Sequence, residues 1–380
     1  MPRIVLNLLY LTPGATGGME TVARALVPEL AAALPDGWDL VAVVGRSARQ
    51  DRSAPWNDLQ TLTLPLDAVQ RAPWMVAEHV AVPLAVRRLG GDLLHSLGNI
   101  GPLRSPVPHC ATVNDLTLHV VEGDTADLKT RLLRGAVSRT ARHADRVICP
   151  STQTVVDLER LVGVDRSRME MLPYGIAAPS VPPTPEAELR ERLGLGQRTL
   201  VLSPSSRLPH KNLPRLLEAH ALLPGPRPLL VMPGYPTAHD DDLSRLADRL
   251  GVADDVLWPG WVDQADLEGL YRVSRLMVFP SLYEGFGLPV LEAMLRGLPV
   301  ACSGRGSLAE IAGDAAELFD AEDPRAIADT VARLLADDAL RAGLVERGRR
   351  QAARYSWPEC ARRHIEVYTG LLAGPGSAAA

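Results

Sequence analysis

Short apolar runs alternate with amphipathic segments along the first half of the chain. The apolar runs occupy residues 3–11, 39–45, 92–97, 109–115 and 146–151. Most positions in each run are apolar, without the alternation of apolar and polar residues that a half-exposed strand would show. Residues 19–34, which follow the first run, have the spacing of an amphipathic helix. Continuous apolar strands separated by helices predict a parallel sheet that is covered on both faces.

The same alternation restarts in the second half, after a break that is rich in proline. Residues 173–185 hold five prolines in thirteen positions, so we place an interdomain linker there. The apolar runs of the second half occupy residues 199–206, 228–234, 255–262, 275–281 and 298–303. The chain is therefore predicted to be an α/β protein of two doubly wound, Rossmann-like domains in series.

The predicted domain boundaries follow from this break. An N-terminal domain covers residues 1–172, and a C-terminal domain covers residues 186–356. A helix is expected over residues 357–373, and the low-complexity tail at residues 374–380 is expected to be disordered. Because ligands of open α/β sheets bind beyond the carboxyl ends of the strands, we expect a site in the cleft between two facing domains.

The charge and cysteine content exclude several classes of protein. The chain has 40 basic and 45 acidic residues, a net charge of −5, so it lacks a basic surplus to neutralise the phosphates of a nucleic acid. Its cysteines form no C-x2-C pair and are typical of reduced thiols, which argues against a zinc cluster or a disulfide framework. The cysteines are Cys110, Cys149, Cys302 and Cys360.

The apolar runs are too short to span a membrane. A membrane-spanning helix needs roughly 18–20 apolar residues, and no run reaches that length. The first run is interrupted by Asn7 and has the pattern of a strand rather than of a signal peptide. We therefore expect a cytoplasmic protein, and association with a membrane surface is left open but is not indicated.

Residues 281–300 contain a glycine turn between a predicted strand and a predicted helix. Pro289 suits the first turn of that helix because its missing N–H has no partner to lose there. Gly285 and Gly287 allow a ligand to approach the backbone closely, and the N–H groups at a helix start favour an anion. This turn is a candidate phosphate site.

Two glutamates, Glu284 and Glu292, lie on either side of the turn, eight positions apart. A carboxylate is unsuited to phosphate but accepts two hydrogen bonds from a vicinal diol. A ligand that carries phosphates in the middle and diols at both ends is a nucleotide sugar. The alternative is that Glu284 caps the turn and that Glu292 is a solvated residue stabilised by the helix dipole.

A second group of polar residues follows the apolar run at residues 199–206. Arg207 and Lys211 come after the predicted strand, and Asn212 is expected to cap a helix that has Pro214 in its first turn. Two cations beside a helix start can hold a diphosphate, the arginine as a fork and the lysine as a point charge. The alternative is an ordinary basic surface turn.

The N-terminal half contributes fewer candidates. Gly17 and Gly18 belong to a glycine-rich loop that a phosphate or a sugar could approach, and Asn114 is a polar residue near the end of an apolar run. The loop lacks the G-x-G-x-x-G spacing, and residues 39–45 end without the acidic residue that holds a ribose, which argues against a nicotinamide-dependent dehydrogenase. The histidines have no spacing typical of a metal site, and no hydrolase motif is present.

Together these residues resemble retaining glycosyltransferase family 4, whose members have the GT-B fold of two Rossmann-like domains facing across a cleft. Residues 280–303 are similar to the family's E-x7-E segment almost position for position, and residues 205–220 resemble its phosphate-binding strand, loop and helix. "GGMETV", residues 17–22, resembles the glycine loop of the N-terminal domain. The resemblance spans nearly the whole chain and is stronger in the C-terminal half.

The resemblance implies a role for each candidate residue. The catalytic set is Glu284, which contacts the donor sugar, with Arg207 and Lys211, which neutralise the diphosphate leaving group. The donor is further bound by Glu292 at the ribose, by backbone N–H groups of Phe286, Gly287 and Leu288, and by Trp261, Val262, Gly17, Gly18 and Asn114. No metal ligand is implied, and the last helix is implied to cross back onto the N-terminal domain.

Two positions depart from the family pattern. Asn114 stands where the family often has a histidine. Arg207 and Lys211 are one residue closer together than in many relatives, which leaves open whether Ser206 or Arg207 takes the usual arginine position.

The implied reaction moves a sugar from a nucleoside diphosphate, as in a GDP- or UDP-sugar, to an acceptor hydroxyl and keeps the anomeric configuration. The departing phosphate takes the acceptor's proton, which fits the lack of an evident general base. Two cations and a helix start replace a metal ion, so no cofactor is expected. The acceptor is a small molecule or a glycan, and the lack of a helix that combines basic and aromatic residues favours a soluble acceptor over a lipid.

Two other functions remain as alternatives. One is a nucleotide-sugar epimerase or phosphorylase on a similar fold, and the other is a catalytically silent GT-B binding protein. The presence of Glu284, Glu292 and Lys211 together argues against the silent protein, because such proteins usually lose their phosphate and sugar ligands.

Overall fold

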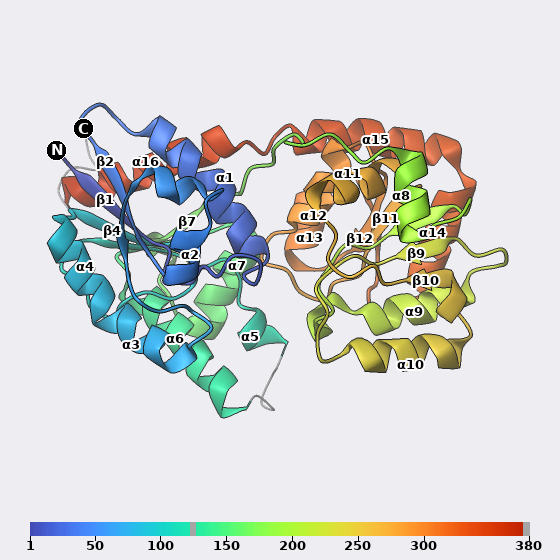
Figure 1. The fold of residues 1–380 in the computed structure, drawn as a ribbon, viewed down its shortest axis with the longest axis horizontal. Coiled ribbons are helices and arrows are strands. Elements are labelled where there is room, and N and C mark those ends of the chain that lie inside the picture. The colour runs from blue at the N-terminus through green and yellow to red at the C-terminus, as the bar shows by residue number, and fades with distance from the viewer. Residues whose placement is uncertain (122–126, 375–380) are drawn as a thin grey trace. The chain divides into compact units, whose positions relative to one another are not determined.

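The computed structural model describes residues 1–121 and 127–374 and divides into two compact units. The first unit contains Met1–Gly175 and the C-terminal segment that starts at Tyr355, and the second contains Ile176–Arg354 (Figure 1). The predicted linker includes the first point at which the chain passes between the units. From residue 375 onward, the tail that the sequence predicts to be disordered lies outside the described residues.

Within the described residues, the first unit is built on a parallel sheet of seven strands in the order β3-β2-β1-β4-β5-β6-β7. The strands are β1 (Arg3–Asn7), β2 (Asp39–Val44), β3 (Gln60–Thr63), β4 (Leu93–Ser96), β5 (His109–Thr112), β6 (Arg146–Cys149) and β7 (Met169–Met171). Five of them lie in the predicted apolar runs. The two edge strands, β3 and β7, lie outside the runs because β3 is partly exposed and polar and β7 is only three residues long.

Helices cover both faces of this sheet. They are α1 (Gly18–Ala33), α2 (Arg46–Gln50), η1 (Pro55–Asp58), α3 (Arg71–His79), α4 (Ala81–Leu89), α5 (Thr117–Val120), α6 (Leu128–His143), α7 (Thr152–Asp157), η3 (Leu158–Val162), η4 (Arg166–Arg168) and α16 (Trp357–Ala373). The chain crosses the sheet in one direction from β1 to β2 and in the other from β3 to β4 and from β5 to β6. Right-handed crossovers therefore place α1 on one face and α3, α4 and α6 on the other.

The last helix, α16, is part of the first unit although it comes last in the sequence. It packs against α1, and Tyr368 on α16 lies 2.6 Å, hydroxyl to Nδ1, from His95 on β4. The other ring nitrogen of His95 meets the Thr112 hydroxyl at 2.8 Å, and burial holds the pKa of His95 well below its usual value, so the ring is neutral. Trp357 stacks on Tyr174 with ring centroids 5.9 Å apart. These contacts fix both ends of the helix.

The second unit has, among the described residues, a parallel sheet of six strands in the order β10-β9-β8-β11-β12-β13. The strands are β8 (Leu200–Leu202), β9 (Leu229–Val231), β10 (Val256–Leu257), β11 (Leu276–Phe279), β12 (Val300–Ser303) and β13 (Glu317–Phe319). The helices are α8 (Glu186–Leu193), η5 (Pro209–Lys211), α9 (Leu213–Leu222), α10 (Asp240–Leu250), η6 (Ala253–Asp255), α11 (Gln264–Val273), α12 (Leu288–Leu295), α13 (Gly306–Ala312), α14 (Pro324–Ala336) and α15 (Asp338–Ala352). The prediction of two doubly wound parallel-sheet domains is confirmed.

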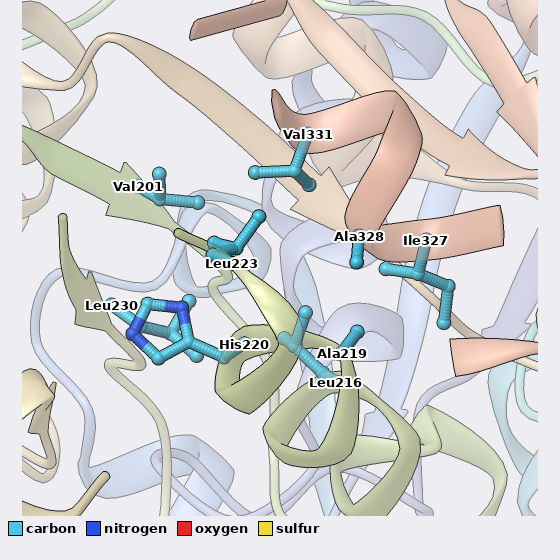
Figure 2. A pocket seen from close by; sticks show the side chains of 9 residues that line it. All are labelled: Val201, Leu216, Ala219, His220, Leu223, Leu230, Ile327, Ala328 and Val331. Carbon is cyan, nitrogen blue, oxygen red and sulfur yellow. The ribbon is translucent and has the colours of Figure 1, made fainter. Parts of the chain in front are cut away.

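The core of the second unit contains a cavity of about 10 Å³ beside α9 and α14 (Figure 2). Its walls are aliphatic side chains except for His220, and burial lowers the pKa of that imidazole to about 4. A space of this size accommodates at most a single water molecule. It is therefore a gap in the packing of the core and is too small for an organic ligand.

Candidate active site

The loops that follow β8 and β11 meet because these strands are neighbours in the second sheet. Lys211 ends the η5 turn after β8, and Glu284 lies in the loop after β11. Lys211 Nζ is 2.7 Å from Glu284 Oε1, and both side chains are largely buried. The N–H of Leu282 also donates to the carbonyl of His210 at 2.8 Å, which joins the same two loops. Two residues predicted from separate motifs thus form one ion pair.

The glycine turn after Glu284 has a backbone that requires glycine. Gly287 is the N-cap of α12 and has a φ of 121°, and an added Cβ would lie 2.9 Å from Leu308 Cδ2. Ser307 Oγ donates to the carbonyl of Glu284 at 2.7 Å, and Phe286 is buried beneath the turn. A helix start leaves its first N–H groups without intrahelical partners, so this turn offers hydrogen-bond donors to an anion.

Glu292 lies one turn into α12 and belongs to a network that the sequence analysis missed. Its Oε2 accepts from the Tyr271 hydroxyl at 3.0 Å. Arg296, one turn further on, pairs with Glu268 at 2.6 Å from Nε to Oε2, and its guanidinium lies 4.9 Å from the centre of the Tyr271 ring. The spacing of Glu292 and Arg296 was a visible signal, but nothing in the sequence connects Tyr271 or Glu268 to them.

Burial raises the pKa of the Glu292 carboxyl, and the Arg296 guanidinium and the Tyr271 hydroxyl oppose part of that rise. Burial likewise raises the pKa of Tyr271 well above its usual value, so the phenol stays protonated and donates. Glu292 is therefore oriented by a fixed donor and keeps its Oε1 for a further hydrogen bond. It is not the freely solvated helix residue of the alternative interpretation.

Arg207 has a carboxylate partner of its own. Its guanidinium is paired with Asp240 at the start of α10 and lies 4.8 Å from the centre of the Trp258 ring. Only 6% of Arg207 is exposed, and burial lowers the pKa of its guanidinium. The hydroxyl of Thr237 donates to the Arg207 carbonyl at 2.9 Å, which fixes the backbone as well.

A cavity of about 290 Å³ adjoins Arg207, and its walls come from η5 and from the starts of α9 and α10. Asn212 forms part of the wall, at the N-cap position of α9, with a φ of 58°. The predicted side-chain cap is wrong, because the Asn212 amide donates to the carbonyls of Pro280, at 3.2 Å, and Ala321, at 2.6 Å. Asn212 instead ties the η5 turn to the loops after β11 and β13.

An aromatic pair with one exposed ring follows β9 and β10. Trp261 is 64% exposed and stacks on Tyr235, with ring centroids 4.1 Å apart and planes 14° from parallel. Val262 comes next and is partly buried. The N–H of Gly234 donates to the carbonyl of Gly260 at 2.9 Å, so the two loops are held together. A flat, exposed ring system of this kind offers a surface on which another ring can stack.

Three serines lie at the carboxyl ends of the adjacent central strands β8, β11 and β12. They are Ser203, Ser281 and Ser303, and all three are fully buried. Within the part of the chain that the structure describes, their hydroxyl oxygens have no hydrogen-bond partner. Buried hydroxyls usually have one, so this edge of the sheet has unused capacity for a polar ligand or for water.

The N-terminal candidates lie in the first unit. Gly17 is the N-cap of α1 with a φ of 62°, Gly18 is the first residue of that helix, and an added Cβ would meet nothing within 4 Å at either position. Asn114 is buried: it accepts from the Tyr174 hydroxyl, and its amide donates to the carbonyl of Leu97 at 3.0 Å. Its internal partners give Asn114 a structural role in the first unit, and its predicted contact with the donor stays a prediction.

The described residues bear on metal binding and on membrane crossing. No group of three or more histidine, cysteine, aspartate or glutamate side chains in them is arranged to hold a metal ion. No helix there combines the length and the apolar character that crossing a bilayer requires.

Two family models match the chain. The model described as "Glycosyl transferases group 1" matches residues 185–351, and the model described as "Glycosyltransferase Family 4" matches residues 16–178. Each model therefore matches a different unit. The match of the "Glycosyl transferases group 1" model includes the Lys211–Glu284 pair and Glu292.

Individual proteins agree with the family models. The D-inositol 3-phosphate glycosyltransferase of Salinispora arenicola is 32% identical over 315 residues, which are 75% of this chain and 70% of that protein. The O-antigen chain mannosyltransferase B of Escherichia coli is 40% identical over 163 residues, which are 42% of this chain and only 43% of that protein.

The solved structure of Anabaena HepE in complex with UDP and glucose is 20% identical and covers 97% of this chain and 100% of its own, with a TM-score of 0.75. At that identity the likeness concerns the fold. Together with the two family models, these matches establish that the chain belongs to glycosyltransferase family 4 and is a hexosyltransferase of the GT-B fold.

Proposed function

We propose that this glycosyltransferase moves a hexosyl group from a nucleoside-diphosphate sugar to an acceptor hydroxyl and retains the anomeric configuration. The observation that carries the proposal is the Lys211–Glu284 ion pair, 2.7 Å long, beside the glycine turn and the start of α12. It combines a cation for phosphate, backbone donors for phosphate and a carboxylate for sugar hydroxyls within two adjoining loops. The HepE complex, which contains UDP and glucose, supports a nucleotide sugar as the donor class.

Lys211, Glu292 and Glu284 each bind a different part of the donor. The diphosphate lies against the helix start of α12, with Lys211 as its counter-charge. Glu292, held by Tyr271, accepts hydrogen bonds from the ribose diol through its Oε1. When the phosphate replaces Glu284 as the ion-pair partner of the Lys211 ammonium, the Glu284 carboxylate turns toward the sugar hydroxyls and accepts hydrogen bonds from them.

The chemical step follows from where charge develops. The bond from the anomeric carbon to the diphosphate oxygen breaks, and negative charge grows on the leaving group, where Lys211 stabilises it. The acceptor oxygen bonds to the same face of the anomeric carbon, and its proton passes to the departing phosphate oxygen. The step needs neither a separate general base nor a covalent glycosyl–enzyme bond.

The cations remove the need for a metal ion in this proposal. Lys211 and the α12 start neutralise the diphosphate, and Arg207 adds a second cation if a phosphate displaces its partner Asp240. Transfer is therefore expected to persist when a chelator is present. The acceptor is a glycan or a small molecule.

The test is a donor panel of UDP-, GDP- and dTDP-sugars incubated with the full chain. Release of nucleoside diphosphate is followed by chromatography, and the anomeric configuration of the released or transferred sugar is read by NMR before it mutarotates. We expect one donor to be hydrolysed slowly with retention. Inversion at the anomeric carbon would overturn the mechanism, and conversion of the intact donor into its epimer would favour the epimerase alternative.

A further inference from the structure

Five exposed aliphatic side chains of the first unit lie on three helices, α3, α4 and α6. They are Val76, Val80, Leu84, Leu128 and Leu132, and between 55% and 73% of each is exposed. The crossovers from β3 to β4 and from β5 to β6 run in the same direction, so their helices cover the same face of the sheet. Figure 1 shows α4, α3 and α6 along one side of the unit.

The exposed residues of α3 and α4 form a single stripe. Val80 joins the two helices with a φ of −118° and a ψ of −54°, so one helix follows directly on the other. Val76, Val80 and Leu84 are four residues apart. The N–H groups of Val80 and Leu84 donate to the carbonyls four residues earlier, at 3.0 and 3.4 Å, so helical spacing continues across the joint and the three residues lie on one side. The stripe continues four residues later at Arg88, with the exposed Arg87 beside it.

A similar stripe runs along α6. Leu128 and Leu132 are four residues apart, and the exposed Arg139, seven residues beyond Leu132, lies on the same side of the helix. The opposite side is buried. Burial, together with the nearby Arg139, lowers the pKa of the His79 imidazole, so Arg139 lies near the end of α3.

The charge on these helices has one sign. α4 and α6 contain no acidic residue, and the single acid of α3, Glu78, is buried; Asp127 caps the start of α6. Exposed basic residues of these helices are Arg71, Arg87, Arg88, Lys129, Arg131, Arg139 and Arg142. Because the whole chain has a net charge of −5, this face is a local reversal of sign. We call the five aliphatic residues together with these basic residues the α3–α4–α6 face.

We propose that the α3–α4–α6 face docks on the surface of an anionic lipid bilayer. Aliphatic side chains can enter the boundary between headgroups and acyl chains while the surrounding arginines meet anionic headgroups. A second copy of the same face is disfavoured because it would oppose cations to cations. Protein interfaces usually rely on aromatic anchors, and the exposed apolar side chains of this face are all aliphatic.

The lack of a helix that combines basic and aromatic residues, which favours a soluble acceptor over a lipid, does not count against docking of this face on a membrane surface. α6 is basic and aliphatic, and aliphatic residues suffice for interfacial burial. The inference concerns lipid binding alone and does not rest on the proposed transfer reaction. It can therefore fail or hold independently of that reaction.

The test is flotation of the full chain with two kinds of vesicles. One kind contains phosphatidylglycerol and phosphatidylcholine in equal parts, and the other contains phosphatidylcholine alone. We expect binding to the anionic vesicles, loss of binding at high salt and little binding to the neutral vesicles. Each removed cation should weaken binding about fivefold. Leu128→Ser with Leu132→Ser should weaken it about tenfold or more.

The controls are matched substitutions on the second unit. Leu222→Ser with Leu318→Ser replaces two exposed leucines, and Arg215→Gln with Arg245→Gln replaces two exposed arginines; neither pair should change vesicle binding. Arg131→Gln with Arg139→Gln is the charge variant of the face, and thermal melts establish that each variant is folded. The proposal is overturned if the anionic vesicles are not bound, or if face and control variants lose binding equally. Assembly of copies through this face without vesicle binding would also overturn it.

Discussion

The ammonium of Lys211 lies 2.7 Å from Glu284 Oε1, although 73 residues separate the two in sequence. The pair exists because β8 and β11 are neighbours, so each strand delivers its following loop to the same edge of the sheet. Lys211 Nζ also lies 5.5 Å from the centre of the Phe279 ring, which adds to the attraction for a cation at this point. The pair is positioned by backbone topology before any ligand binds.

Replacing Lys211 by alanine should abolish most of the activity. Loss of a single group that stabilises charge in the transition state typically lowers kcat by about a hundredfold to a thousandfold. We expect a fall of that size in steady-state kinetics from a protein that still unfolds cooperatively, with a lower melting temperature because Glu284 loses its partner. The matched control is Arg215→Ala, because Arg215 is an exposed cation on α9 that pairs with its own helix neighbour Glu218.

Lys211→Arg separates charge from shape at the same position. Arginine keeps the positive charge but is a planar fork in place of a compact point charge. We expect this variant to bind nucleoside diphosphate in calorimetry while losing about tenfold in kcat. Equal activity in Lys211→Arg and the unmodified protein would mean that charge alone suffices, and near-normal activity in Lys211→Ala would remove Lys211 from the mechanism.

Replacing Tyr271 by phenylalanine tests whether Glu292 binds the ribose. The substitution removes the hydroxyl that donates to Glu292, and a net hydrogen bond is worth about 1 kcal/mol, so KM for the donor should rise about fivefold at unchanged kcat. The hydroxyl also lowers the pKa of Glu292, so its loss raises that pKa further. As the pH falls, the variant should therefore lose donor affinity at a higher pH than the unmodified protein.

Steady-state kinetics with the donor measure KM and kcat, and titration calorimetry with the nucleoside diphosphate at a series of pH values measures the pH dependence of the affinity. Tyr368→Phe is the control, because it removes another buried tyrosine hydroxyl, the partner of His95 in the first unit. Its donor KM should not change. A Tyr271→Phe variant with unaltered affinity and pH dependence would disconnect Glu292 from the nucleotide.

The sequence predicts the elements of this protein better than it predicts side-chain partners. Continuous apolar runs identify the central strands because burial on both faces makes most of their positions apolar. The edge strand β3 has no such run, since one of its sides faces solvent. Lys211 and Glu284 were both found because each follows a buried strand, but their direct contact depends on the strand order, which local pattern does not contain.

The side-chain partners that the sequence did not predict also depend on how the elements pack in three dimensions. Tyr271 and Glu268 lie on α11 and meet Glu292 and Arg296 on α12 only through tertiary packing. Asn212 has the residue type and position of a cap, yet two buried carbonyls from distant loops compete successfully for its amide. Lysine stands at only two positions of the chain, 129 and 211, and that rarity was an available signal for a specific role of Lys211.

The buried Glu78 should make the stability of the protein depend on pH. Burial raises the pKa of its carboxyl to about 8, and the amide of Asn7 and the indole of Trp74, which donate to it, oppose that rise. Between the ordinary pKa of a glutamate, about 4.3, and the raised value, the unfolded chain loses this proton while the folded chain keeps it. The contribution of Glu78 is thus complete at low pH and is lost as the pH rises toward about 8.

Thermal melts between about pH 5 and about pH 8 measure this loss. Glu78→Gln has a neutral side chain at every pH, so its melting temperature should decline less over that range than that of the unmodified protein. Glu191→Gln, an exposed position on α8, should follow the unmodified protein. Identical pH profiles in all three proteins would show that Glu78 is not protonated in the folded state.

The ion pair between Arg207 and Asp240 determines whether the Arg207 guanidinium can bind a phosphate of the donor. In the ligand-free chain the guanidinium is occupied by Asp240 and covered by Trp258. If Arg207 binds the diphosphate, a phosphate must displace Asp240, and Asp240→Asn should strengthen nucleoside-diphosphate binding several-fold by removing the competing charge. Because a largely buried guanidinium then lacks its partner, the variant should also lose stability, on the order of 2 kcal/mol.

Calorimetric titration and denaturant unfolding of Asp240→Asn and Arg207→Ala distinguish a binding role from a purely structural one. A binding role requires opposite effects on affinity, with Asp240→Asn tighter and Arg207→Ala weaker, although both variants are less stable. Asp241→Asn is the control, since Asp241 is an exposed acid on the same helix turn and is not part of the cavity wall beside Arg207. If both variants of the pair lower stability and leave nucleotide affinity unchanged, Arg207 supports the fold and Lys211 alone provides the side-chain cation for the diphosphate.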